Sequence, residues 1–241
     1  MIVEVCANSF ESALNAEKAG AHRIELCSEL AVGGITPSFG LIKKVIETLS
    51  IPVFVLIRSR SGSFTFSDDE MDIMKHDIKL CKELGCAGIV SGVLNDDNTV
   101  DIEKTKQLVD LAKPLPFTFH RAFDWVPNPI DAIEELKRLG VDRVLTSGQQ
   151  TSAALALHFL KELKELGQQK LSVLPGGGIK PENAALFAKA GFDEIHVSAS
   201  TIETVIEQPK ITMNSSKFFD ETIKSYSDIR TIQSILKATT L

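Results

Sequence analysis

Short apolar runs alternate with helical patterns along the chain, and this alternation limits the possible folds more than any other feature. The runs are rich in β-branched and aromatic residues, which favour strands. They begin at Ile2, Arg23, Val53, Ala87, Phe117, Arg143, Leu171 and Glu194. The segments between them carry helix-start signals, among them a capping-box spacing at Ser67 and Glu70 and predicted first-turn prolines at Pro37, Pro129 and Pro181. A last amphipathic segment runs from Ser227 to Lys237.

Eight strand–helix units without a linker or a low-complexity segment predict an α/β fold, the (β/α)8 TIM barrel. A chain of 241 residues is the usual size for one such domain, so we expect a single domain over residues 1–241. The alternative is a doubly wound sheet. That fold requires fewer strands and a glycine-rich first turn, and the segment SFES after Asn8 does not provide one.

The composition predicts a cytoplasmic globular protein without a nucleic-acid or membrane partner. The net charge of -6 and a pI near 5.5 argue against a nucleic acid or an anionic membrane as partner. No apolar stretch is long enough to span a bilayer, and the first residues do not resemble a secretory signal. Four cysteines are too few for a disulfide scaffold at this length, so we expect reduced thiols.

Polar side chains are predicted to converge inside the barrel, because strand side chains alternate between its two faces. In the first strand Val3 and Val5 face the helices, which leaves Glu4 and Cys6 facing the axis. The same alternation, together with the end of the third strand, adds Arg23, Glu25, Cys27, Arg58, Thr118, His120, His196 and Ser198.

Two interpretations of these charges stay open. They form a structural layer of ion pairs, since buried charge is unfavourable unless it is paired. Alternatively they form an active site, which we favour because they lie near the catalytic end of the barrel. The predicted catalytic residues are then Glu4, Glu25, Arg58, His120 and His196, with His120 as acid or base.

Cys6 and Cys27 occupy matching positions on adjacent predicted strands, so we expect their sulfur atoms to lie within a few ångströms of one another. Two thiolates in this arrangement suit a soft ion such as Cu(I). The other interpretation is a pair of small buried hydrophobic residues, which cysteine often provides.

The loops after the seventh and eighth strands predict an anion site. Gly176, Gly177 and Gly178 precede a helix, and Ser198 ends the last strand. In TIM barrels these two loops commonly bind phosphate through backbone N–H groups. A glycine triplet is also found in tight turns without a ligand.

Several segments resemble the CutC family of copper homeostasis proteins. They are AHRIELCSELAVGGITPS (21–38), FTFHRAFD (117–124), RVLTSGQ (143–149), GGGI (176–179) and EIHVS (194–198). The resemblance implies a cytosolic TIM barrel that forms homo-oligomers, here a dimer or a tetramer. It also implies a Cu(I) site at Cys6 and Cys27, and it matches His120, Arg121 and Asp124 to the family signature.

The chain departs from the family pattern in two places. The loop after the third strand reads RSRSGSFTF, so Ser59, Ser61, Ser63 and Phe66 replace a proline, a glycine, an acid and a tyrosine. The segment 201–216 has no clear match. Three hypotheses follow: a Cu(I)-binding protein of copper homeostasis, an enzyme for a small anionic substrate such as a phosphorylated one, and a purely structural barrel. The last leaves the converging charges unexplained.

Overall fold

The computed structural model describes residues 1–168, 170–206, 211, 220 and 222–240. Within these residues strands and helices alternate as the sequence predicts. The strands of the barrel are β1 (Ile2–Ala7), β2 (Arg23–Leu26), β3 (Val53–Leu56), β4 (Gly88–Ser91), β5 (Phe117–Phe119), β6 (Arg143–Thr146), β7 (Ser172–Pro175) and β8 (Glu194–Val197). The helices are α1 (Phe10–Ala19), α2 (Phe39–Thr48), α3 (Asp68–Leu84), α4 (Ile102–Ala112), α5 (Pro129–Leu139), α6 (Leu157–Gly167), α7 (Pro181–Lys189) and α8 (Ile229–Thr239).

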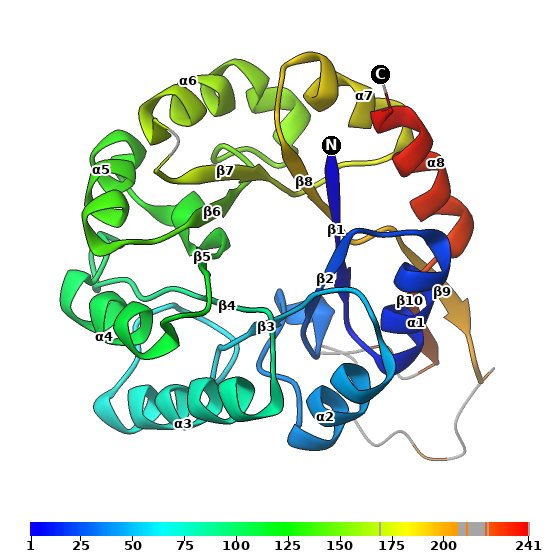
Figure 1. The fold of residues 1–241 in the computed structure, drawn as a ribbon, viewed down its shortest axis with the longest axis horizontal. Coiled ribbons are helices and arrows are strands. Elements are labelled where there is room, and N and C mark those ends of the chain that lie inside the picture. The colour runs from blue at the N-terminus through cyan, green and yellow to red at the C-terminus, as the bar shows by residue number, and fades with distance from the viewer. Residues whose placement is uncertain (169, 207–210, 212–219, 221, 241) are drawn as a thin grey trace.

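The strands β1 to β8 form one parallel ring with the helices outside it (Figure 1). Consecutive strands pair from β1 to β7, and β1 also pairs with β8. A single bridge between Gly176 and His196 joins β7 to β8 and closes the ring. A Cβ atom on Gly176 would lie 2.5 Å from Leu145 Cδ1 and 3.1 Å from His196 Cβ, so a larger residue at this closure would have to displace both side chains. The predicted TIM barrel is confirmed.

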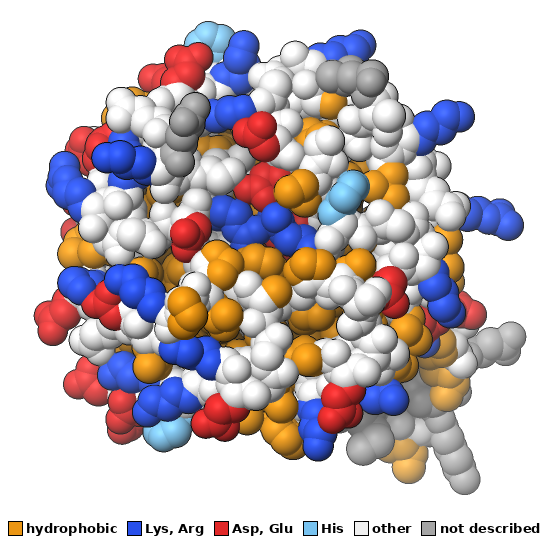
Figure 2. All heavy atoms as spheres, in the orientation of Figure 1, with side chains coloured by type: hydrophobic (Ala, Val, Ile, Leu, Met, Phe, Trp, Pro, Cys, Tyr) orange, Lys and Arg blue, Asp and Glu red, His pale blue; other side chains and the backbone are white. Residues whose placement is uncertain are grey.

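Side-chain alternation separates an outer apolar core from a charged barrel interior. Val3, Val5, Ile24 and Leu26 belong to the outer core between strands and helices, as predicted. A smaller cluster fills part of the interior and consists of Cys6, Cys27, Phe54, Leu56 and Val90. Buried charged residues lie beside it, namely Glu4, Arg23, Glu25, Arg143 and Glu194. Figure 2, which looks along the barrel, shows basic and acidic side chains gathered at the centre of the face.

The helix-start signals correspond closely to the observed caps. Ser67 and Glu70 form a capping box at α3, and Pro129 and Pro181 lie in the first turns of α5 and α7. The prediction for Pro37 is wrong. Ser38 accepts a hydrogen bond from the Leu41 N–H and caps α2, so Pro37 precedes the helix. Among the described helices, none is both long enough and apolar enough to cross a bilayer.

An antiparallel pair of strands, β9 (Ser200–Thr204) and β10 (Ile223–Ser227), lies between β8 and α8. Figure 1 shows this pair projecting beside α1. Most of β9 falls at the start of the stretch 201–216, which departs from the expected family pattern. Residues 207–210 and 212–219, which the predicted domain includes, lie outside the described residues.

Candidate functional site

A cavity of about 1120 Å³ opens where the barrel strands end. The floor residues come from β1, β2 and β8, and they are Cys6, Glu25 and His196. The other lining residues lie in the segments that follow the barrel strands along the chain. They include Arg58, Phe64, His120, Trp125, Gly177, Gly178, Lys180 and Ser198. Three predicted site residues do not line the cavity: Glu4, Cys27 and Gly176.

Glu4 belongs to a layer of buried ion pairs below the cavity. Its carboxylate pairs with Arg23, whose other side pairs with Glu194. Arg143 Nη1 lies 3.6 Å from Glu4 Oε2 and 3.8 Å from Glu194 Oε2. Burial alone would raise the pKa of Glu4, but the hydrogen bond from His196 and the charges of Arg23, His196 and Arg143 outweigh it and lower that pKa to about 2. This layer matches the structural interpretation of the inward charges.

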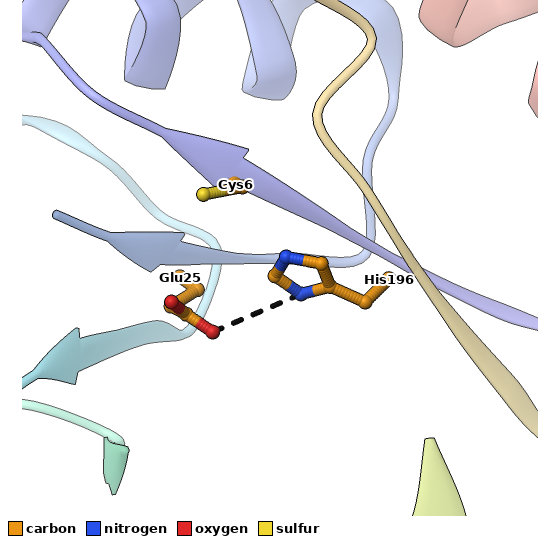
Figure 3. A group of neighbouring side chains, drawn as sticks. All are labelled: Cys6, Glu25 and His196. Atoms are coloured by element: carbon orange, nitrogen blue, oxygen red, sulfur yellow. Dashed lines mark ion pairs between the residues drawn. The ribbon is translucent and has the colours of Figure 1, made fainter. Parts of the chain in front are cut away.

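His196 connects the ion-pair layer to the cavity floor. Its Nδ1 lies 2.8 Å from Glu4 Oε1 and 3.8 Å from Glu25 Oε2. Figure 3 shows the second ring nitrogen, Nε2, on the side of Cys6. Burial disfavours the imidazolium, but contacts with Cys6, Glu25 and Glu4 raise the pKa of His196 well above its usual value. Glu4 therefore orients a ring whose Nε2 faces the cavity floor.

Glu25 is the incompletely paired carboxylate of the floor. Its side chain is almost completely buried, and among the described residues Oε2 has no hydrogen-bond partner. Burial is the main reason why the pKa of Glu25 rises to about 7, with the charge of Glu4 adding to it and those of His196, Arg143 and Arg23 opposing it. Glu4 and Glu25 thus differ strongly in acidity although both project into the same barrel.

The sulfur atoms of Cys6 and Cys27 lie 3.6 Å apart. Their strand positions nevertheless differ from the expected match, because the Cα register pairs Cys6 with Glu25. Cys27 is two residues further along, and the stagger between barrel strands brings the two sulfurs together. The contact with Cys27 and burial raise the pKa of Cys6 well above its usual value, so the Cys6 thiol stays protonated when no metal ion is bound.

His120 lies just beyond β5 and caps a short 3-10 helix, η2 (Arg121–Trp125). Its Nδ1 accepts a hydrogen bond from the Ala122 N–H at 3.4 Å. Burial and the nearby charge of Arg58 lower the pKa of His120 to about 3. The neutral ring must then carry its proton on Nε2, which is buried and has no hydrogen-bond partner among the described residues. His120 is therefore a neutral donor at pH 7.

Arg58 binds the backbone of the loops around it. Its Nη1 donates to the carbonyl groups of Val32 and Gly34, both at 2.9 Å, and its Nη2 donates to that of Gly62 at 2.7 Å. The guanidinium also lies 4.6 Å from the centre of the Phe64 ring. Arg58 lines the cavity as predicted, but most of its donors hold the loops after β2 and β3 in place.

Asp124 and Arg121 organise the opposite rim. Asp124 accepts hydrogen bonds from Thr146 Oγ1 at 2.5 Å and from the Ser147 N–H at 3.0 Å. Arg121 donates to Asp124 at 2.7 Å and to Ser147 Oγ at 3.0 Å. These contacts join η2 to the loop after β6. Arg121 stays about half exposed, so it remains able to contact a ligand at the mouth.

Gly177 and Gly178 both have positive φ angles, of 100° and 68°, a conformation that favours glycine. Among the described residues, neither of their N–H groups donates to another protein group. The adjacent start of α7 is less suitable for an anion, because Pro181 lacks an N–H and Glu182 adds a negative charge. The N–H groups of the glycine loop are therefore better placed to donate to an anion than the start of α7 is.

Sequence reasoning left several important residues out of the site. Arg143 and Glu194 complete the ion-pair layer, and the alternation that places Glu4 inward also places them inward. Trp125 and Phe64 line the cavity and stack edge to face, with ring centres 4.9 Å apart. Phe64 comes from a loop and Trp125 from η2, and strand alternation has no predictive value in either.

Comparisons with known proteins agree on one family. The sequence model of the CutC family matches residues 1–201. A mouse protein named copper homeostasis protein cutC homolog is 48% identical over 199 residues, which cover 82% of this chain and 73% of the mouse protein. Its human counterpart is 43% identical over 243 residues, which cover 98% and 89% of the two chains.

Solved structures agree with this result. The crystal structure of a putative copper homeostasis protein CutC from Streptococcus agalactiae has a TM-score of 0.78 and 34% identity, and covers 82% of this chain and 98% of that one. A protein described as native KDPGal has a TM-score of 0.57 at 14% identity, over 98% and 92% of the two chains. That likeness shows the barrel fold alone.

Proposed function

Since the chain belongs to the CutC family, we propose that it binds Cu(I) through Cys6 and Cys27 as part of copper homeostasis. The observation that carries this proposal is the 3.6 Å separation of the two sulfur atoms. Relatives named for copper homeostasis support it.

The donor set fits the ion. Cu(I) prefers soft sulfur ligands, and both cysteines are free thiols. Cys6 lines the cavity, whereas Cys27 lies behind it, so an ion would reach the pair past Cys6. Bound Cu(I) would be held by two sulfur ligands, and His196 beside Cys6 offers a nitrogen.

An anaerobic Cu(I) titration against a competing chelator tests the proposal. We expect one tightly bound Cu(I) per chain, and loss of this binding in both Cys6→Ser and Cys27→Ser. The double variant Cys81→Ser/Cys86→Ser is a matched control, because it removes another pair of buried thiols that are in contact with each other. Unchanged affinity in the Cys6 and Cys27 variants would refute the dithiolate site.

A second candidate function, catalysis on a small anionic substrate, is favoured by the cavity. Its volume of about 1120 Å³ far exceeds what a metal ion needs and suits an organic ligand. Glu25, His196 and His120 reach it from three places in the barrel. We propose that Glu25 and His196 transfer protons there, while His120 donates a hydrogen bond to a substrate oxygen.

The anionic group of such a substrate would bind between Arg121 and the glycine loop. The free N–H groups of Gly177 and Gly178 and the half-exposed guanidinium of Arg121 provide its donors. Inorganic phosphate is a suitable probe. We expect it to raise the melting temperature of the protein but not that of Arg121→Gln, and an equal rise in both would contradict this assignment.

Three further properties remain predictions from the resemblance and the composition: cytoplasmic location, assembly into a homo-oligomer, and absence of a nucleic-acid or membrane partner. Light scattering on the purified chain tests the second.

A further inference from the structure

The floor of the cavity contains a group of ligand atoms that the dithiol site does not explain. Cys6, Glu25 and His196 each offer one ligand atom, and the three atoms lie within 4.8 Å of one another. All three residues are buried, and all three line the cavity. Figure 3 shows their side chains converging from β1, β2 and β8.

We propose that Cys6, Glu25 and His196 bind a zinc ion, with Glu4 holding the imidazole in place. The site does not depend on either function proposed above. It shares Cys6 and the nearby nitrogen of His196 with the Cu(I) site, but it does not use Cys27. Zinc accepts sulfur, nitrogen and carboxylate oxygen together, whereas Cu(I) prefers sulfur and Mg²⁺ or Ca²⁺ prefer oxygen.

The unsatisfied oxygen of Glu25 is the strongest sign of a cation site. The residue is 5% exposed, and Oε2 has no hydrogen-bond partner within the described part of the chain. Buried carboxylate oxygens are normally paired. A cation between Cys6 and His196 would supply the partner, because the ligand atoms of the three residues lie within 4.8 Å of one another.

The surroundings of His196 match those of a metal-binding histidine. Such a ring usually donates its other N–H to a carboxylate, which fixes its orientation. Here Nδ1 lies 2.8 Å from Glu4 Oε1, and Nε2 lies on the side of Cys6 (Figure 3). Glu4 is in turn held by Arg23, so the orienting carboxylate is itself fixed.

Geometry and charge both suit zinc. Tetrahedral zinc with these ligands has ligand atoms about 3.3–3.8 Å apart, so small side-chain rotations from the present 4.8 Å limit would complete the site. A thiolate and a carboxylate neutralise the charge of Zn²⁺ in this buried position. Three protein ligands leave a fourth position open towards the cavity, as in zinc enzymes.

Zinc titration of the whole chain, stripped of metal under reducing conditions, tests the proposal. We expect one Zn²⁺ per chain, weakened about 100-fold or more in Glu25→Gln, because loss of an outer partner alone costs about 10–100-fold. Cys27→Ser is the matched control and should keep zinc affinity within a few-fold. Co²⁺ should give a thiolate-to-metal absorption band that Cys6→Ser abolishes and Cys27→Ser retains.

The opposite pattern would overturn the site. If Cys27→Ser loses zinc and Glu25→Gln retains it, the ion binds at the dithiol instead. Equal zinc binding in all variants would indicate only an adventitious surface ion, and no stoichiometric zinc in the wild type would also refute the proposal. Should Glu25→Gln fail to fold, as judged by circular dichroism, the comparison of Cys6→Ala with the double variant Cys6→Ala/Cys27→Ser decides whether residual zinc binding uses Cys27.

Discussion

His196 Nδ1 lies 2.8 Å from Glu4 Oε1, and this contact joins two parts of the barrel interior. Below it, Glu4, Arg23, Arg143 and Glu194 neutralise one another. Above it, His196 faces the cavity with Cys6 and Glu25. The two interpretations of the inward charges are therefore compatible, because one group of charges supports the other.

Glu4→Gln should destabilise the fold strongly. The change keeps the size of the side chain but leaves Arg23 and Arg143 with one carboxylate fewer. Breaking a buried ion pair in this way costs about 3–5 kcal/mol. Urea unfolding at pH 7 measures the loss. Glu11→Gln is the control, since its pair with Lys224 is about half exposed and exposed pairs contribute little. Equal unfolding midpoints for the two variants would contradict a structural role for this layer.

His120 should make the protein less stable as the pH falls. Its pKa is about 3 in the folded protein and near 6.5 in the unfolded chain. Below pH 6.5 the unfolded chain binds a proton that the folded protein does not, so this contribution is present above pH 6.5 and declines towards pH 3. Between pH 7 and pH 5 the wild type should lose about 2 kcal/mol more than His120→Gln.

Urea unfolding at both pH values gives this difference, and parallel losses in the two proteins would speak against a buried neutral ring. Nitrogen-15 NMR of the imidazoles supplies an independent measurement. One ring should stay neutral with its proton on Nε2 down to pH 5, and its signal should be missing from His120→Gln.

Arg58→Lys should loosen the loops after β2 and β3. One ammonium group cannot replace a guanidinium that donates to Val32, Gly34 and Gly62, and we expect a loss of about 3 kcal/mol. Chymotrypsin should then cut faster at Leu30 or Phe64, as mass spectrometry of the fragments would show. Arg138→Lys on the exposed face of α5 is the control. If the ligand-free variant is cleaved at the same rate as the wild type, Arg58 serves mainly to bind a ligand and not to hold the loops.

The repeat and the period-two alternation predicted most of the barrel, because both follow from burying one face of each strand. They place Glu4, Cys6, Glu25 and His196 inside correctly. Side-chain alternation does not predict the stagger between neighbouring strands. The register of Cys6 with Glu25 follows from how the ring closes, which depends on all eight strands together.

Loop geometry limited the rest of the prediction. Arg58 and Gly176 were both expected to contact a ligand. Arg58 lines the cavity, and it also binds carbonyl groups of loops whose path no periodic pattern describes. Gly176 does not line the cavity and provides the close approach that joins β7 to β8. The pair β9 and β10 was not predicted either. Apolar and polar residues alternate only weakly in its strands. Most of these residues are exposed, so burial imposes little pattern on their sequence.

Gly88→Ala should show how tightly the barrel interior is packed around Phe54. A Cβ atom at position 88 would lie 1.9 Å from Phe54 Cε1, and the ring has little freedom because Arg143 lies 4.0 Å from its centre. Overpacking of this kind costs about 3 kcal/mol. Phe54→Leu makes room for the methyl group. The double variant should therefore lose less unfolding free energy than the two single variants lose together, by about 1–3 kcal/mol. A double-mutant cycle in urea measures this coupling. Strictly additive losses would mean that the backbone of β4 shifts to admit the methyl group without displacing Phe54.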